Sequence, residues 1–152
     1  MLLATQNQTG ENFLKLWFQR GKLIQEEREN KEKAMNILAS VGLAEKAKDF
    51  AGALSGGQRK LLEIARTLMC DPHLILLDEP AAGVNPTLIN QICEHILQWN
   101  KDGISFLIIE HNMDMIMSIC QHIWVLAEGS NLADGTPEEI KNNRQVLEAY
   151  LG

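Results

Sequence analysis

Residues 74–80 read LILLDEP, a short apolar run that ends in two adjacent carboxylates. An uninterrupted apolar run of this length is typical of a strand buried on both faces, as in a parallel sheet. Such a strand would place Asp78 and Glu79 at its C-terminal end, where open α/β sheets hold their ligands. Phosphoryl transfer to water needs an acid beside the metal ion and a group that orients the water. We predict these roles for Asp78, next to Mg²⁺, and for Glu79, as general base; the alternative is a strand ending in a solvated acidic turn.

A second apolar run, at residues 104–109, is followed directly by Glu110 and His111. Between the two runs, Pro86 suits the first position of a helix. The apolar face of that helix comprises Ile89, Ile92, Cys93 and Ile96. This order predicts a strand–helix–strand unit with His111 at the end of its second strand. An imidazole placed there can donate a hydrogen bond to a terminal phosphate or help to hold the attacking water. The alternative is an isolated surface or core histidine.

The segment 54–58 reads LSGGQ and precedes a predicted helix that runs from about Gln58 to Met69. Ser55 can cap this helix, and a helix N-terminus favours anions. Gly56 and Gly57 allow backbone N–H groups to approach a ligand closely. The segment therefore suits a terminal phosphate, although the same residues also form an ordinary turn and cap.

The two parts of the chain differ in predicted class. Residues 1–70 read as helical, with an apolar cluster at 13–18, a charged helical face at 25–33 and a helix end at Gly42. Residues 71–152 alternate strands and helices. A third strand is predicted at 123–127, a turn at 129–131 and a capping box at 136–139. We therefore predict a helical subdomain followed by part of an α/β core.

Composition and charge narrow the class of protein. The chain has 152 residues, enough for about one domain, and a formal net charge of -6. That charge gives no global attraction to nucleic acid. The three cysteines lack C-x-x-C spacing, which favours free thiols in a reducing compartment. No apolar run approaches the ~18 residues of a membrane span, and the N-terminus does not read as a signal peptide. We expect a cytoplasmic protein whose membrane role, if any, depends on a partner.

The three motifs occur in one order, which resembles the ATP-binding subunits of ABC transporters. In that family LSGGQ is the signature motif, residues 75–80 match Walker B with the catalytic glutamate, and His111 matches the switch histidine. Residues 59–68 resemble the helix that follows the signature, and 81–86 the D-loop, with Asn85 where an aspartate is usual. This variant, with the segment 109–113 and the ending at 135–152, resembles the branched-chain amino acid uptake subgroup.

The resemblance implies an α/β, P-loop NTPase-like fold and an ATP-hydrolysing subunit that energises a membrane permease. Two cassettes would form a homo- or heterodimer, with no nucleic acid bound and no direct membrane insertion. The nucleotide-contacting residues, acting across the dimer, would be Ser55, Gly56, Gly57 and Gln58. Asp78 would serve Mg²⁺ through water, Glu79 and His111 would be catalytic, and Gly83 and Asn85 would lie at the dimer interface. The protein would sit at the cytoplasmic side of the membrane, held there by the permease.

One expected motif is missing from these 152 residues. No G-x-x-x-x-G-K-[ST] segment is present, and neither Gln6 nor Gln8 fits the glutamine of the family's Q-loop. The resemblance thus covers the C-terminal part of a cassette. Two alternatives stay open, a non-catalytic half-cassette that binds or regulates a partner, and a soluble ATPase of DNA repair or translation. We also expect an exposed apolar sheet edge, which would leave the chain marginally stable or promote self-association. Trp99, Trp124 and the stripe 113–117 are either partly uncovered at that edge or packed in the core.

Overall fold

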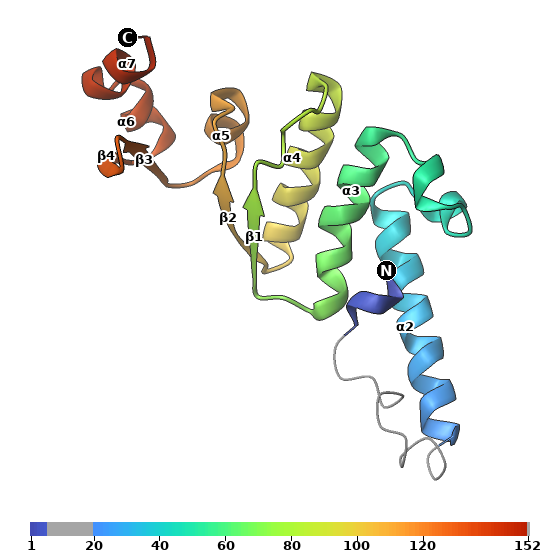
Figure 1. Cartoon of the computed structure of the whole chain (residues 1–152). Helices are drawn as coiled ribbons and strands as arrows, with labels where there is room; N and C mark the ends of the chain where they lie inside the picture. The colour runs from blue at the N-terminus through green and yellow to red at the C-terminus, as the bar shows by residue number, and fades with distance from the viewer. Residues whose placement is uncertain (6–19, 152) are drawn as a thin grey trace. The chain divides into compact units, whose positions relative to one another are not determined.

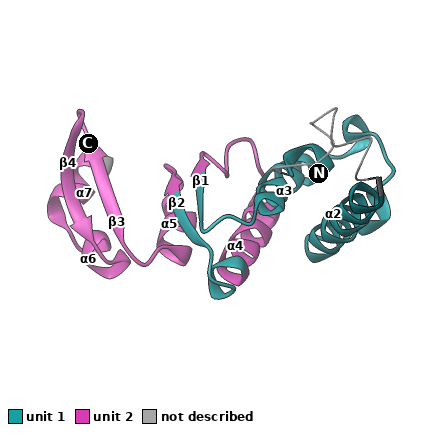
Figure 2. Cartoon of the chain, turned by 90° about the horizontal axis from the view of Figure 1, so that it is seen from below, with its two compact units in different colours: residues 1–76, 99–107 teal, residues 77–98, 108–152 magenta. Residues whose placement is uncertain are grey.

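The computed structural model describes residues 1–5 and 20–151, so the predicted cluster at 13–18 and the glutamines at 6 and 8 lie outside the described residues. The chain forms two compact units, shown in Figure 2. The first comprises residues 1–76 and 99–107, and the second residues 77–98 and 108–152. The division at residue 70 into a helical subdomain and an α/β core stays a prediction.

The first unit is built mainly on helices α2 (Arg20–Ser40) and α3 (Gly56–Thr67), which pack against each other (Figure 1). Short 3₁₀ turns connect them or flank them: η1 (Leu2–Ala4), η3 (Ala44–Lys46), η4 (Ala51–Ala53) and η5 (Leu68–Cys70). The buried residues of the two helices are Ala34, Leu38, Leu61, Ile64 and Ala65. The sequence predicts an apolar stripe for α3 at Leu61, Ile64, Ala65 and Leu68, and the first three of these residues are buried.

Helix α2 ends as the sequence predicts, at Gly42. This glycine has φ +69°, a left-handed conformation that costs a residue without a side chain little. Its N–H donates to the carbonyl of Ala39 at 3.1 Å, and the N–H of Leu43 donates to that of Leu38 at 2.7 Å. This pair of bonds is a Schellman motif. The polar stretch at 25–33 forms the solvated face expected for it, with i, i+4 ion pairs such as Arg28–Glu32.

Strands β1 (Leu74–Asp78) and β2 (Ser105–Ile109) form a two-stranded parallel sheet, connected by α4 (Pro86–Lys101). Both strands and the connecting helix were predicted. The prediction that the strands are buried on both faces is wrong. Ile75 and Leu77 are buried, whereas the alternate positions on β1 and β2 are exposed: Leu74, Leu76, Leu107 and Ile109. Successive side chains of a strand point to opposite faces of the sheet. The rest of the described chain packs against one of these faces and leaves the other exposed.

The second unit contains α5 (Met113–Ile119), an antiparallel hairpin of β3 (Ile123–Ala127) and β4 (Ser130–Gly135), α6 (Pro137–Lys141) and α7 (Arg144–Leu151). Its core is formed by Ile116, Ile123, Ile140 and Val146. The third predicted strand exists, but its partner β4 was not predicted. Of the predicted turn at 129–131, only Gly129 lies between the strands. The capping box at 136–139 is confirmed, since the Thr136 N–H donates to Glu139 Oε2 at 2.8 Å.

The aromatic and methionine side chains divide between core and surface. Trp99 and Met115 are buried, whereas Trp124 is 59% exposed. Of the two alternatives, partial uncovering thus holds for Trp124 and core packing for Trp99. All three cysteines are free. Within residues 20–151, no helix has both the length and the apolar character that a membrane span requires.

The exposed face of β1 predicts self-association of the chain. Leu76 is 68% exposed, so replacing it by lysine should weaken association without disturbing the buried face. Sedimentation velocity over a range of concentrations measures the effect. The control is Gln91→Lys, at an exposed position of α4 with the same change of charge. Equal association of both variants and the unmodified chain would contradict the prediction.

Candidate functional site

The start of α3 presents two backbone N–H groups at Gly56 and Gly57. Ser55 caps the helix, because its Oγ accepts from the Gln58 N–H at 3.2 Å while its own N–H donates to Gln58 Oε1 at 3.0 Å. The Arg59 N–H donates to the Ser55 carbonyl at 2.9 Å. The first N–H groups of a helix have no acceptor within the helix. The capping box therefore leaves those of Gly56 and Gly57 available at the positive end of the helix dipole.

Space at this helix start is open. A Cβ added to Gly56 would meet no atom within 4 Å apart from its chain neighbours and the backbone of its own helix. The buried residues Leu61, Ile64 and Ala65 hold the helix in the first unit, so its first turn has a defined direction. An anion such as a terminal phosphate fits this arrangement chemically. The predicted role of Ser55 as helix cap is confirmed, and the predicted contact with nucleotide stays a prediction.

A tight turn follows β1 and carries the two predicted carboxylates. The N–H of Glu79 donates to the carbonyl of Ile109 at 2.9 Å, which ties the end of β1 to the end of β2. Glu79 has φ +46°, in the left-handed region that a residue with a side chain rarely adopts. Such a conformation costs on the order of 1–3 kcal/mol and is found most often at functional sites. Pro80 behind it is fully buried, whereas Asp78 and Glu79 are exposed.

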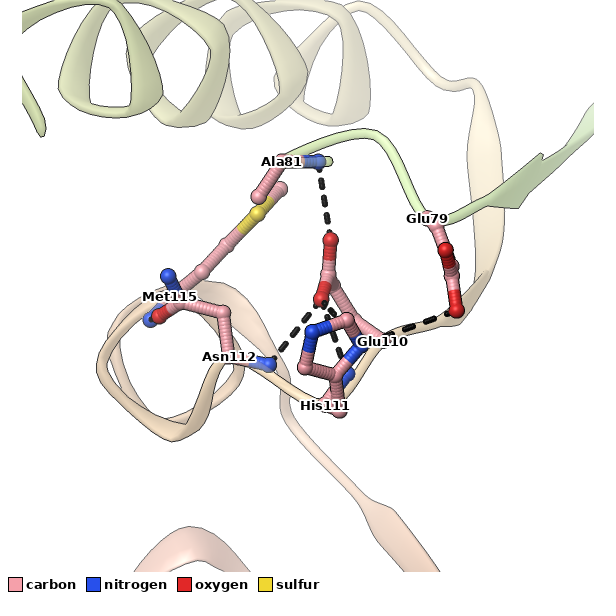
Figure 3. Close-up of polar contacts among 6 residues, drawn as sticks. All are labelled: Glu79, Ala81, Glu110, His111, Asn112 and Met115. Atoms are coloured by element: carbon pink, nitrogen blue, oxygen red, sulfur yellow. Dashed lines mark hydrogen bonds and ion pairs between the residues drawn. The ribbon is translucent and has the colours of Figure 1, made fainter. Parts of the chain in front are cut away.

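Glu79 and His111 lie side by side at the ends of the two strands, as Figure 3 shows. Glu79 Oε1 is 3.6 Å from His111 Nδ1, and the two side chains are 54% and 74% exposed. This distance is longer than a direct hydrogen bond. Both groups are accessible to a molecule from solvent, and together they can accept and donate protons. The structure thus brings together the two side chains predicted to be catalytic.

Glu110 is a polar residue of this region that the sequence prediction missed. Its side chain has 0% exposed surface. Oε1 accepts from the Ala81 N–H at 2.8 Å, and Oε2 accepts from the N–H groups of His111 and Asn112 at 2.8 and 2.9 Å (Figure 3). Burial raises the pKa of this carboxyl, but the three N–H donors and the nearby His111 outweigh it, so the pKa of Glu110 lies below its ordinary value. A glutamate at the end of an apolar strand was the signal available in the sequence.

The residues predicted for the dimer interface lie in the loop before α4. Gly83 is exposed and has φ +69°. Asn85 is also exposed, and its Oδ1 accepts from the Leu88 N–H at 2.9 Å, so it caps α4. The sequence prediction gave Asn85 no such capping role. Exposure of both residues is compatible with an interface, which stays a prediction.

Residues able to hold Mg²⁺ are few in this region. No cluster of three histidine, cysteine or acidic side chains suited to a metal exists among the described residues. Mg²⁺ is usually held by one or two carboxylates together with phosphate oxygens and water. Asp78, exposed at the end of β1, fits the part of one such carboxylate. Asp78, Glu79, Gly83, Asn85 and His111 belong to the second unit, and residues 55–58 to the first.

The contacts of Glu110 predict a stability that depends on pH. Because the pKa of Glu110 is lowered in the folded chain, the unfolded chain binds more protons. The stabilisation is therefore complete above the ordinary pKa of 4.5 and is lost as pH falls through the lowered value. Glu110→Gln should lower the free energy of unfolding at neutral pH by about 1–3 kcal/mol.

The difference in the free energy of unfolding between the unmodified chain and Glu110→Gln should become smaller in acid. Urea denaturation at neutral pH and below the ordinary carboxyl pKa measures both values. A difference that is the same at both pH values would contradict this assignment.

Two family models match parts of this chain. The family described as ABC transporter matches residues 3–82, more than half of the chain. The family described as branched-chain amino acid ATP-binding cassette transporter matches residues 130–152.

Two similar relatives are named as branched-chain amino acid transport ATP-binding proteins. The probable protein LivG of Archaeoglobus fulgidus is 46% identical over 87% of this chain and 51% of its own length. The high-affinity protein BraF of Pseudomonas aeruginosa is 42% identical over 100% of this chain and 60% of its own length. The chain thus spans about half to three fifths of the length of these curated relatives.

Solved structures of ATP-binding cassettes share the fold. A nucleotide-free cassette from an ABC transporter has a TM-score of 0.78 and 42% identity, covering 99% of this chain and 61% of its own. The ADP conformation of the cassette MJ1267 has a TM-score of 0.76 and 41% identity, covering 82% and 50%. The α/β, P-loop NTPase-like fold expected from the sequence is confirmed. The chain belongs to the ABC transporter family.

Proposed function

We propose that this chain is an ATP-binding subunit of an ABC importer and that its α3 N-terminus contacts ATP held by a second cassette. The observation that carries the proposal is the first turn of α3. There the capping box of Ser55 and Gln58 leaves the N–H groups of Gly56 and Gly57 to meet an anion. Family membership makes a nucleotide phosphate the expected anion.

In the proposed complex the second cassette supplies G-x-x-x-x-G-K-[ST], a segment that these 152 residues do not contain. That loop cradles the phosphates and supplies a lysine and a metal-binding hydroxyl. A partner with such a loop would hold ATP, and residues 55–58 would complete the site from the other side. ATP binding would close the two cassettes on each other, and hydrolysis would let them open.

The polar residues after β1 and β2 would lie at the other nucleotide site of the pair. Their chemistry suits hydrolysis of a nucleotide bound there. Asp78 would hold Mg²⁺ through water, and the ion, when bound, neutralises charge on the phosphates. Glu79 would orient the attacking water and take its proton. His111, whose Nδ1 lies 3.6 Å from Glu79 Oε1, would donate a hydrogen bond to the terminal phosphate. Gly83 and Asn85, both exposed, would face the partner cassette.

The names of the relatives support a proposal for the cargo. Proteins 42–46% identical to this chain are named for branched-chain amino acid transport. We therefore propose a branched-chain amino acid as cargo and a permease that docks on residues 1–70. The chain would work on the cytoplasmic side of the membrane, attached through that permease.

A mixing experiment tests the contact made in trans. The partner is a full-length ABC cassette that carries G-x-x-x-x-G-K-[ST] but whose own signature serine is replaced by arginine. Adding this chain should raise its ATPase rate at least tenfold, because only residues 55–58 of this chain can complete the site. Ser55→Asp should abolish the rise, since aspartate still caps α3 but repels phosphate.

The matched control is Asn143→Asp. The Oδ1 of Asn143 accepts from the Gln145 N–H at the start of α7, so this variant also adds one negative charge at a helix cap. It should stimulate as well as the unmodified chain. No stimulation by a folded chain, or equal stimulation by Ser55→Asp, would contradict the proposal. Binding to the partner without stimulation would instead favour the non-catalytic half-cassette.

A further inference from the structure

The buried carboxylate of Glu110 joins two loops that carry different functional side chains. We propose that Glu110 is a positioning residue that fixes the loop after β1 against the loop after β2, so that Glu79 and His111 stay adjacent. The functional meaning of that pair rests on the function proposed above. The structural claim itself does not depend on it.

Glu110 uses its two oxygens for different loops. Oε1 accepts from the Ala81 N–H at 2.8 Å, two residues beyond Glu79. Oε2 accepts from the N–H groups of His111 and Asn112 at 2.8 and 2.9 Å. One side chain therefore spans a sequence separation of 29 residues and sets the distance between the two backbones.

The position of Glu79 is held from both sides. Its own N–H donates to the Ile109 carbonyl at 2.9 Å, and the Ala81 N–H is held by Glu110. Between these two bonds Glu79 keeps its left-handed φ of +46°. Release of Ala81 would remove the contact with the loop after β2 and leave the bond to Ile109 and the bond within the turn from the Ala82 N–H to the Glu79 carbonyl at 3.1 Å.

His111 is held through the neighbouring backbone. Asn112, which donates to Glu110, also caps α5, because its Oδ1 accepts from the Met115 N–H at 3.0 Å. Met115 is 1% exposed and anchors that helix in the second unit. The His111 ring is 74% exposed, and its Nδ1 lies 3.6 Å from Glu79 Oε1 and 3.7 Å from Glu110 Oε2. Its position follows from the backbone that Glu110 holds.

No other side chain of similar size can replace this arrangement. Glutamine has one acceptor oxygen, so it can keep the bond to Ala81 or the bonds to His111 and Asn112, but not all three. Its NH₂ group would then face an N–H donor. Aspartate is one methylene shorter and cannot reach both loops from the same backbone position.

Nuclear magnetic resonance of the isolated 152-residue chain tests the proposal. In the unmodified chain the amides of Ala81, His111 and Asn112 should be protected from hydrogen exchange, and a nuclear Overhauser effect should connect the His111 ring with the Glu79 side chain. In Glu110→Gln, exchange at Ala81 or at the 111–112 pair should become at least tenfold faster. The Overhauser effect should fall by at least half.

The matched control is Glu94→Gln, at an exposed carboxylate of α4 in the second unit, which should change none of these signals. Amide protection within α3 and α5 reports whether Glu110→Gln is still folded, and it should match the control. Glu110→Asp serves as a second variant and should show the same local losses. Unchanged protection at all three amides, or an undiminished Overhauser effect, would overturn the proposal.

These measurements use neither nucleotide nor partner. Failure of the mixing experiment with intact local signals would therefore count against the proposed function alone. Local signals that do not respond to Glu110→Gln would count against the positioning role alone.

Discussion

The second unit depends on one buried carboxylate that is satisfied by three backbone N–H groups. A charge removed from water is costly unless hydrogen bonds compensate it, and Glu110 receives such bonds on both oxygens. Because its donors come from two loops, the compensation also fixes those loops relative to each other. The strained backbone of Glu79 persists between this contact and the last bond that joins β1 to β2. In the positioning role proposed above, the geometry of the exposed pair Glu79–His111 follows from a side chain that solvent does not reach.

In the first unit, side-chain oxygens likewise accept from backbone N–H groups, here at the start of α3. Ser55 and Gln58 satisfy each other's backbone N–H groups, and burial of residues such as Ile64 holds the helix behind them. The donors that remain, at Gly56 and Gly57, are available at the positive end of the helix. A structural cap and a candidate anion site are therefore made by the same four residues.

The helix caps, one helix end and three of the strands could be predicted from the sequence, because each depends on residues close together in the chain. The helix cap at Ser55, the helix end at Gly42 and the capping box at Thr136 each depend on residues within five positions of one another. The strands at 74–78 and 105–109 follow from short apolar runs. Burial of these two strands on both faces was predicted wrongly, because an apolar run does not show which other segments pack against it. Trp124 is exposed for the same reason.

The sequence by itself determined strands β1, β2 and β3, the starts of α4 and α6, and the family that the three ordered motifs resemble. Local backbone chemistry and side-chain spacing suffice for these properties. Only the tertiary structure decided that Glu110 holds Ala81, that Glu79 lies beside His111, and that one face of β1 is exposed. These depend on contacts between residues about thirty positions apart, and a pattern along the chain does not specify which distant N–H group a carboxylate will meet.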